Sequence, residues 1–77
     1  MKKIQILGTG CPKCKMLTAH AEEAVKQLGL EASIEKVEKI TDIMKFGIMT
    51  TPGLVVDGKV RSAGKLLSVE DIKKHLA

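Results

Sequence analysis

The fold of this chain is decided near its start, where residues 2–14 read KKIQILGTGCPKC. Apolar side chains gather in the first half of this stretch, and we predict a strand over residues 2–7. Pro12 suits the first position of a helix, because proline lacks an N–H that would be unpaired there in any case. The two cysteines of the chain, Cys11 and Cys14, therefore lie where a strand ends and a helix begins.

A long helix is predicted over residues 12–28, with Gly29 as its C-terminal cap. Its apolar and small residues recur at helical spacing, namely Cys14, Leu17, Ala21, Ala24, Val25 and Leu28. Alternation of apolar and polar residues over 30–35 predicts a half-buried second strand. A short helix should follow, capped by residues 41–42 (Thr-Asp) and ending at Gly47.

A hairpin and a last helix are predicted for the remaining residues. The apolar run over 53–56 is typical of a central strand. Asp57-Gly58 is the two-residue signal for a type I′ turn, which returns through residues 59–63. Ser68 and Asp71 resemble a capping box. The buried stripe of the helix that they begin would be Val69, Ile72 and Leu76.

Together these elements predict an α/β fold with the order β-α-β-α-β-β-α, in a single domain over residues 1–77. A right-handed crossover makes the first two strands parallel neighbours. The hairpin then extends the same sheet. We expect a four-stranded mixed sheet in the order 2-1-3-4, with helices on both faces.

Composition and charge exclude several classes of function. Phe46 is the sole aromatic residue, which argues against stacking of single-stranded nucleic acid. The net charge of +4 comes from lysines scattered among nine acidic residues, which is typical of a solvated surface. No apolar run approaches the length of a signal peptide core or a membrane helix. We expect a cytoplasmic monomer without a nucleic-acid or membrane partner.

The spacing of the cysteines favours reversible redox chemistry. Side chains three apart on a helix lie about 5–6 Å apart at Cβ, near the separation that a disulfide needs. Cys11 would be the exposed N-cap, where unpaired N–H groups, the helix dipole and nearby Lys13 lower a thiol pKa. Pro12 would hold the first turn. We predict that Cys11 attacks a target disulfide and that Cys14, on the buried stripe, resolves the mixed disulfide.

Two other uses of the cysteines compete with this interpretation. A purely structural disulfide would close too short a loop to restrict the unfolded chain much. Two thiolates can hold a soft metal such as Cu(I) or zinc. Only His20 and His75 could complete a closed zinc site, and we interpret both as surface histidines. Covalent haem is excluded, because Lys15 stands where Cys-x-x-Cys-His requires histidine. We expect no metal and no cofactor.

The second feature of interest is Thr51-Pro52, which precedes the predicted central strand. From the residues alone the trans peptide bond is favoured, because about 5–6% of such bonds are cis. However, Gly-Thr-Gly-Cys-Pro-Lys-Cys (8–14) after a strand, with Thr-Pro before Leu-Val-Val-Asp-Gly (54–58), resembles the thioredoxin–glutaredoxin superfamily. The chain is most similar to the small archaeal and bacterial thioredoxin-like proteins labelled redox-active disulfide proteins, in the minimal four-strand form of the fold.

The resemblance implies roles for the motif residues. Cys11 would be the attacking and Cys14 the resolving thiol of a thiol–disulfide oxidoreductase. Pro52 would be a cis-proline facing the disulfide, and Thr51 would offer backbone hydrogen bonds to an extended substrate. The implied partners are disulfide-containing target proteins and a thioredoxin-reductase-like or other dithiol reductase.

This chain departs from typical members of the superfamily at several positions. Thioredoxins bury an acid six residues before the first cysteine, where this chain has Gln5. They also carry Trp where Gly10 stands, and Gly-Pro in place of Pro12-Lys13. Glutaredoxins grip glutathione with a Gly-Gly-x-Asp-like segment, which Ser-Ala-Gly-Lys (62–65) replaces here. We therefore expect glutathione to be a poor reductant.

Two alternatives to the oxidoreductase stay open. The first is a metallochaperone that uses the two thiolates. Heavy-metal-binding domains have a similar length, yet their element order is β-α-β-β-α-β and they lack Thr-Pro. The second alternative is an interaction module that keeps the fold and seldom uses redox chemistry.

Overall fold

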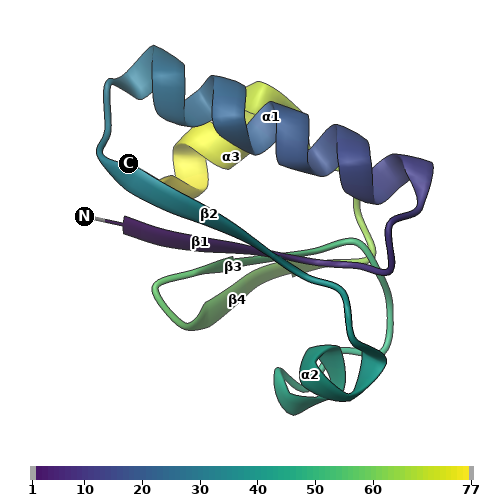
Figure 1. Ribbon diagram of the computed structural model, residues 1–77. Helices are drawn as coiled ribbons and strands as arrows, with labels where there is room; N and C mark the ends of the chain where they lie inside the picture. Colours follow the sequence, from purple (N-terminus) through teal and green to yellow (C-terminus); the bar gives the residue numbers. More distant parts are fainter. Residues whose placement is uncertain (1, 77) are drawn as a thin grey trace.

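The computed structural model describes residues 2–76, and its helices cover both faces of a single sheet (Figure 1). Helices α1 (Pro12–Leu28) and α3 (Val69–Leu76) lie side by side on one face. Helix α2 (Ile40–Lys45) lies on the other face, near the end of the sheet where the chain leaves β1 for α1. The predicted three-layer α/β architecture is thus confirmed.

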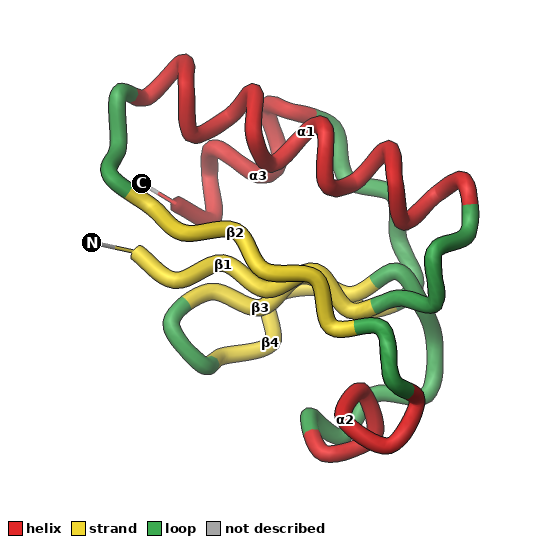
Figure 2. Tube along the Cα trace, in the orientation of Figure 1, coloured by secondary structure: helices red, strands yellow, loops and turns green. Residues whose placement is uncertain are grey.

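The sheet contains four strands in the order β2-β1-β3-β4. Their bounds are Lys2–Leu7 for β1, Ala32–Val37 for β2, Gly53–Val56 for β3 and Lys59–Ala63 for β4. Strands β1 and β2 are parallel, whereas β1 pairs with β3, and β3 with β4, in antiparallel register. The tube in Figure 2 shows the hairpin turn between β3 and β4. The predicted strand order is confirmed.

The hairpin turn has the backbone conformation that its sequence predicts. Asp57 has a φ of 50° and Gly58 a φ of 83°, and a type I′ turn needs a positive φ at both central residues. Asp57 also secures the neighbouring strand. Its carboxylate accepts a hydrogen bond of 2.9 Å from the N–H of Lys3, and the ammonium of Lys2 lies 3.7 Å away. The turn is thereby attached to the start of β1.

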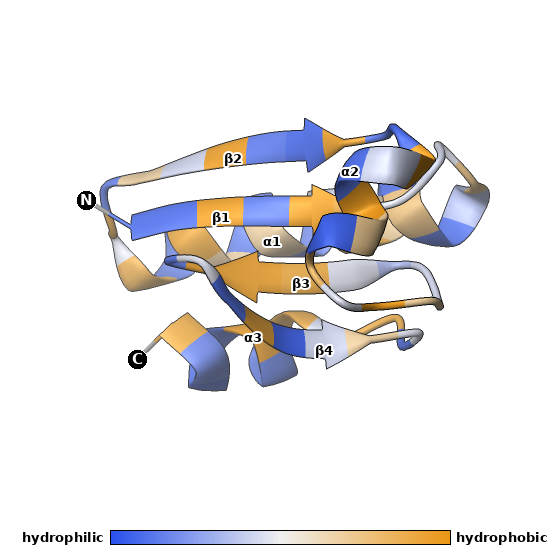
Figure 3. Ribbon diagram, turned by 90° about the horizontal axis from the view of Figure 1, so that it is seen from below, coloured by the Kyte–Doolittle hydropathy of each residue, from blue (hydrophilic) through white to orange (hydrophobic). Residues whose placement is uncertain are grey.

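Alternation along the strands divides the core into two clusters, one on each face of the sheet. Ile4 and Ile6 of β1 face α1 and α3, where they pack with Leu17, Leu54, Ile72 and Leu76 among others. Leu7 faces the α2 layer and packs with Val37, Ile43, Ile48 and Val55. Strand β3 is buried along its whole length, which explains its unbroken apolar sequence (Figure 3). The sheet is therefore held between two apolar layers.

The ends of the helices agree with most of the predicted caps. Helix α1 spans the predicted residues, with Gly29 at a φ of 65° as its C-cap. Ser68 Oγ accepts a hydrogen bond from the N–H of Asp71 at 3.2 Å, as a capping residue should. The predicted Thr41-Asp42 cap of α2 is wrong. This helix begins at Ile40, because the carbonyl of Lys39 already accepts hydrogen bonds from the N–H groups of Asp42 and Ile43.

The second strand also differs from its predicted bounds. It begins at Ala32 and continues to Val37, whereas the alternation of apolar residues predicted a strand over 30–35. Parallel pairing with β1 sets the bounds, since each residue from Lys2 to Leu7 has a partner in β2. No helix among residues 2–76 has the length and apolar content to cross a bilayer.

Candidate functional site

The two cysteines lie together at the first turn of α1. Cys11 is the N-cap, with an extended backbone, and its carbonyl accepts the hydrogen bond from the N–H of Lys15 at 3.1 Å. Pro12 occupies the first helical turn, as predicted. The Sγ atoms of Cys11 and Cys14 lie 2.6 Å apart, and both thiols are free. A small movement would bring them to the bond length of a disulfide, about 2.05 Å.

The two thiols differ in their exposure. Cys14 begins the buried stripe of α1 and is 5% exposed, whereas Cys11 is half-buried at the surface. The side chains of Pro12 and Lys13 are exposed between them. A reagent or a protein from solution therefore reaches Cys11 more easily than Cys14.

Their pKa values shift in opposite directions. The pKa of Cys11 is lowered, first by a hydrogen bond from the Cys14 thiol and then by backbone N–H groups of the first turn. The pKa of Cys14 is raised, mainly by burial and next by its hydrogen bond to Cys11. The predicted direction for Cys11 agrees with this, although a neighbouring thiol rather than the lysines is the largest cause. Cys11 therefore loses its proton at a lower pH than Cys14.

Gly8 makes the close packing of Cys14 possible, and the sequence analysis did not single it out. A Cβ at this position would overlap Cys14 Sγ and lie 2.9 Å from Cys14 Cβ. The N–H of Gly8 also donates to the carbonyl of Val37 at 3.0 Å, which fixes the chain at the end of β1. A glycine between a strand and a Cys-x-x-Cys turn is the signal that could have identified it.

Thr51-Pro52 lies at the same end of the sheet as the dithiol. Leu7 at the end of β1 pairs with Gly53 at the start of β3, so the segments that follow Leu7 and precede Gly53 are neighbours. The Thr51–Pro52 peptide bond is cis, as the family resemblance implied. Pro52 is buried and its carbonyl accepts a hydrogen bond of 2.9 Å from the N–H of Gly64, whereas Thr51 is exposed.

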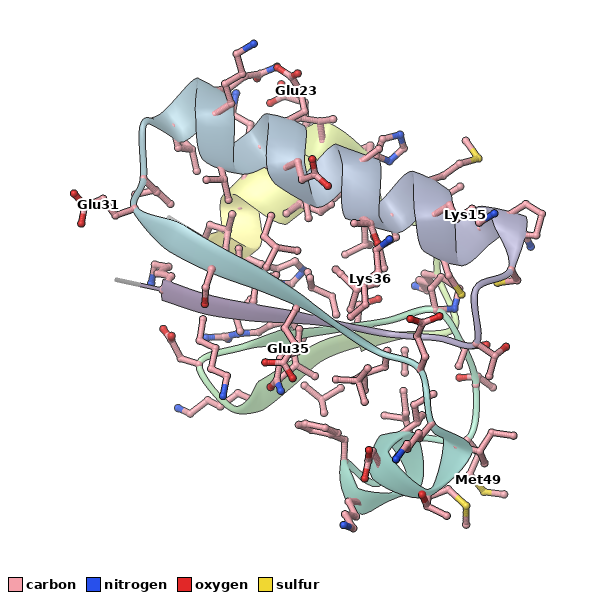
Figure 4. All side chains as sticks on the ribbon, viewed as in Figure 1. Lys15, Glu23, Glu31, Glu35, Lys36 and Met49 are labelled. Atoms are coloured by element: carbon pink, nitrogen blue, oxygen red, sulfur yellow. The ribbon has the colours of Figure 1, made fainter. Side chains whose placement is uncertain are left out.

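An apolar groove adjoins this end of the sheet. It has a volume of about 220 Å³ and is lined by Thr9, Thr51 and apolar side chains of α2 and the following loop, including Ile40, Met44 and Met49. Met49 is 94% exposed and projects into solvent beyond α2 (Figure 4). The groove thus joins the loop before Cys11 to the loop before Pro52.

Gln5 does not lie beside the dithiol. Its side chain shares the α2 face of the sheet, where it lines a groove with Glu35 and Phe46. Cys14 lies on the other face, above Ile6. The residue at this position of β1 therefore has no direct access to the buried thiol.

Neither histidine is placed to complete a metal site with the cysteines. The ring Nδ1 of His20 lies 2.8 Å from the carbonyl oxygen of Leu67, a contact that ties α1 to the loop before α3. In the part of the chain that the structure describes, no group of three or more histidine, cysteine or acidic side chains could hold a metal ion. The element order also differs from the β-α-β-β-α-β order of heavy-metal-binding domains.

Comparison with known proteins gives consistent matches. The family model described as a thioredoxin domain matches residues 2–77. The chain is 48% identical over 77 residues to a thioredoxin of Methanothermobacter thermautotrophicus, and the match covers 100% of both chains. It is 41% identical over 76 residues to a thioredoxin of Methanocaldococcus jannaschii, covering 99% of this chain and 87% of the relative. A probable thioredoxin of Methanothermobacter marburgensis is 33% identical over 57 residues, 70% of this chain and 67% of the relative.

Proposed function

Because this chain belongs to the thioredoxin family, we propose that it is a thiol–disulfide oxidoreductase that reduces the disulfides of other proteins through Cys11 and Cys14. The observation that carries the proposal is that the two thiols differ in exposure and in the direction of their pKa shifts. Cys11 is accessible and has a lowered pKa, and Cys14 is buried beside it with a raised pKa. This arrangement suits an attacking thiol followed by a resolving thiol.

The reaction would proceed in two exchanges. The Cys11 thiolate attacks one sulfur of the target disulfide, which breaks the target S–S bond and releases its other sulfur as a thiolate. Cys14 then loses its proton and attacks Cys11 Sγ, which lies 2.6 Å away in the reduced protein. The Cys11–Cys14 bond forms, the mixed disulfide breaks, and the target leaves with two electrons more than it had. Pro12 and Lys13 would fix the first helical turn and help to set the pKa of Cys11.

Target binding would use the segment before β3. In this proposal the backbone of exposed Thr51 pairs with an extended strand of the target, while buried Pro52 shapes the loop. The apolar groove lined by Thr9, Thr51 and Met49 would accept side chains next to the target disulfide. Recognition through backbone hydrogen bonds and an adaptable methionine surface suits targets of varied sequence.

The oxidised protein would need a dithiol reductant to complete the cycle. We propose a thioredoxin-reductase-like or other dithiol reductase, in the cytoplasm, where cysteine pairs are usually redox-active. Glutathione should be a poor reductant, because residues 62–65 carry the sequence Ser-Ala-Gly-Lys in place of a glutathione-gripping segment.

The decisive experiment traps the mixed disulfide. Cys14→Ser should accumulate a covalent adduct with an oxidised model protein, visible by non-reducing electrophoresis and lost on adding dithiothreitol. Cys11→Ser should give no adduct, since Cys14 is buried. An adduct that forms equally through Cys14 would contradict the assignment of the two thiols.

A second measurement separates redox activity from metal binding. Thiol titration of the metal-free wild type should give two free thiols after reduction and none after mild oxidation. Protein that stays reduced in the oxidising buffer yet binds Cu(I) tightly would support the metallochaperone instead.

A further inference from the structure

A small recess opens beside the buried thiol of Cys14. Its volume is about 60 Å³, enough to admit water. The floor is formed by Ile6 and Gly8 of the β1 segment, and Cys14 and Thr18 of α1 line one wall. Lys15, Lys36 and Glu38 complete the rim with charged side chains. The buried thiol of Cys14 thus lies beside a recess whose rim carries two lysines and one glutamate.

Glu38 and the Cys14 thiol both lie near Gly10 at this recess. Gly10 lines the recess together with Cys14. The carboxylate oxygen Oε2 of Glu38 lies 3.6 Å from the position that a Cβ of Gly10 would occupy. Glu38 therefore lies beside the loop that precedes Cys11, and it reaches the recess from the residue that follows β2.

Glu38 is the side chain on this recess that carries a carboxylate, the chemical group of a general base. Lys15 on α1 and Lys36 on β2 are cations there. The hydroxyl of Thr18 donates a hydrogen bond of 3.0 Å to the carbonyl oxygen of Cys14. Cys11 Sγ is the sulfur that Cys14 must attack. Figure 4 shows Lys36 extending from β2 into the space between the sheet and α1.

The chemistry of the resolving step requires such an acceptor. Burial holds the pKa of Cys14 above its ordinary value, so this thiol is protonated while it waits beside the mixed disulfide. It becomes a nucleophile only when the proton leaves. A base within reach, directly or through one water, speeds a proton transfer of this kind.

We propose that Glu38 accepts the proton of Cys14, directly or through water in the recess, as Cys14 attacks Cys11. The S–H bond of Cys14 breaks and its proton passes to the Glu38 carboxylate. The Cys11–Cys14 bond forms while the bond from Cys11 to the target sulfur breaks. The target sulfur leaves as a thiolate, which takes up a proton from Glu38 or from solvent. The inference rests on the proposed function, because it assigns a residue to the second of its two exchanges.

The test follows the two exchanges separately with an aromatic disulfide that releases a coloured nitrothiobenzoate. The first release reports attack by Cys11, and the second reports attack by Cys14. In Glu38→Gln we expect the second release to slow by about tenfold at neutral pH. This is less than the roughly 100-fold or more of a well-placed general base, because Glu38 is exposed. The difference should vanish at alkaline pH, where Cys14 ionises unaided.

Glu35→Gln is the matched control. It removes the same charge three residues earlier in the chain, but Glu35 lies on β2 across the sheet from Lys36, on the α2 face (Figure 4). We expect both of its release rates to equal those of the wild type, and the first release of Glu38→Gln to be unchanged.

Three outcomes would overturn the assignment of Glu38. They are an unchanged second release in Glu38→Gln, a faster one, and an equal slowing in Glu35→Gln. Failure of the proposed function would look different, because the wild type itself would give no second release. If Glu38→Gln slows the second release at neutral pH and Glu35→Gln does not, the result would support the proposal.

Discussion

Replacement of Gly8 by alanine tests whether the dithiol depends on the missing side chain at this position. The added Cβ would overlap Cys14 Sγ and come within 2.9 Å of Cys14 Cβ. Forcing a methyl group into a packed site destabilises a protein by about 1–3 kcal/mol. Alanine recovers about 0.4–1 kcal/mol by restricting the unfolded chain, because the φ of Gly8 is outside the left-handed region. The net loss should be about 1–2 kcal/mol.

A loss of this size is measurable by thermal unfolding. Each kcal/mol lowers the Tm of a domain of 60–100 residues by roughly 4–8 °C, so Gly8→Ala should unfold about 4–16 °C below the wild type. Displacement of Cys14 should also slow closure of the Cys11–Cys14 disulfide. Circular dichroism of the reduced proteins gives the Tm, and thiol titration after mild oxidation gives the rate of closure.

A double-mutant cycle assigns the cause. Cys14→Ala removes the sulfur that the new methyl group overlaps, so Gly8→Ala should destabilise this background less than the wild type, by at least about 0.5 kcal/mol. Gly53→Ala is the matched control, since its Cβ would meet Ile48 Cδ1 at 2.6 Å and Leu7 Cβ at 3.3 Å and touch neither cysteine. Gly53→Ala should lower the free energy of unfolding by the same amount with and without the Cys14 sulfur. An equal cost of Gly8→Ala in both backgrounds would refute the packing argument.

Two further predictions concern ionisation. Cys14→Ala removes the largest cause of the lowered pKa of Cys11, so the pKa of Cys11 should rise. Alkylation of Cys11 by iodoacetamide at neutral pH should therefore slow. An unchanged pH profile of alkylation would show that the backbone alone lowers the pKa of Cys11. The pKa of Asp57 is lowered, mainly by the N–H of Lys3, so its stabilising effect exists above the ordinary carboxyl pKa and disappears as pH falls through the lowered value. Asp57→Asn should therefore lower the Tm at neutral pH and converge with the wild type in acid, whereas a constant difference would contradict the linkage.

Local signals in the sequence were enough to predict most of the fold. Asp57-Gly58, Gly29 and the run 53–56 each impose a turn, a cap or a buried strand without help from distant residues. The start of α2 was missed, because a carbonyl of Lys39 can begin a helix without any side-chain cap. The bounds of β2 were missed because pairing with β1 sets them.

The candidate site shows the same division between local and distant information. The order of exposure of Cys11 and Cys14 follows from helical periodicity, and the sequence predicted it. The glycine before the Cys-x-x-Cys turn was a signal for Gly8, but the closeness of Glu38 to the recess could not be predicted, because it depends on how the end of β2 packs beside the first turn of α1. The register of the strands and the close contacts between distant residues are properties of the assembled sheet, and a local sequence pattern does not report them.

Because β1 lies between β2 and β3, the order in which the ribosome delivers the strands affects folding. A nascent chain that ends after β2 has one edge of β1 unpaired, since the partner of that edge is residues 53–56. It also lacks Ile72 and Leu76, which close the cluster around Ile4 and Leu17. At about 5–20 residues per second, synthesis from the end of β2 to the end of β3 takes about 1–4 s. During this interval β1 can pair with a foreign strand, so the native sheet is secured only when the second half of the chain emerges.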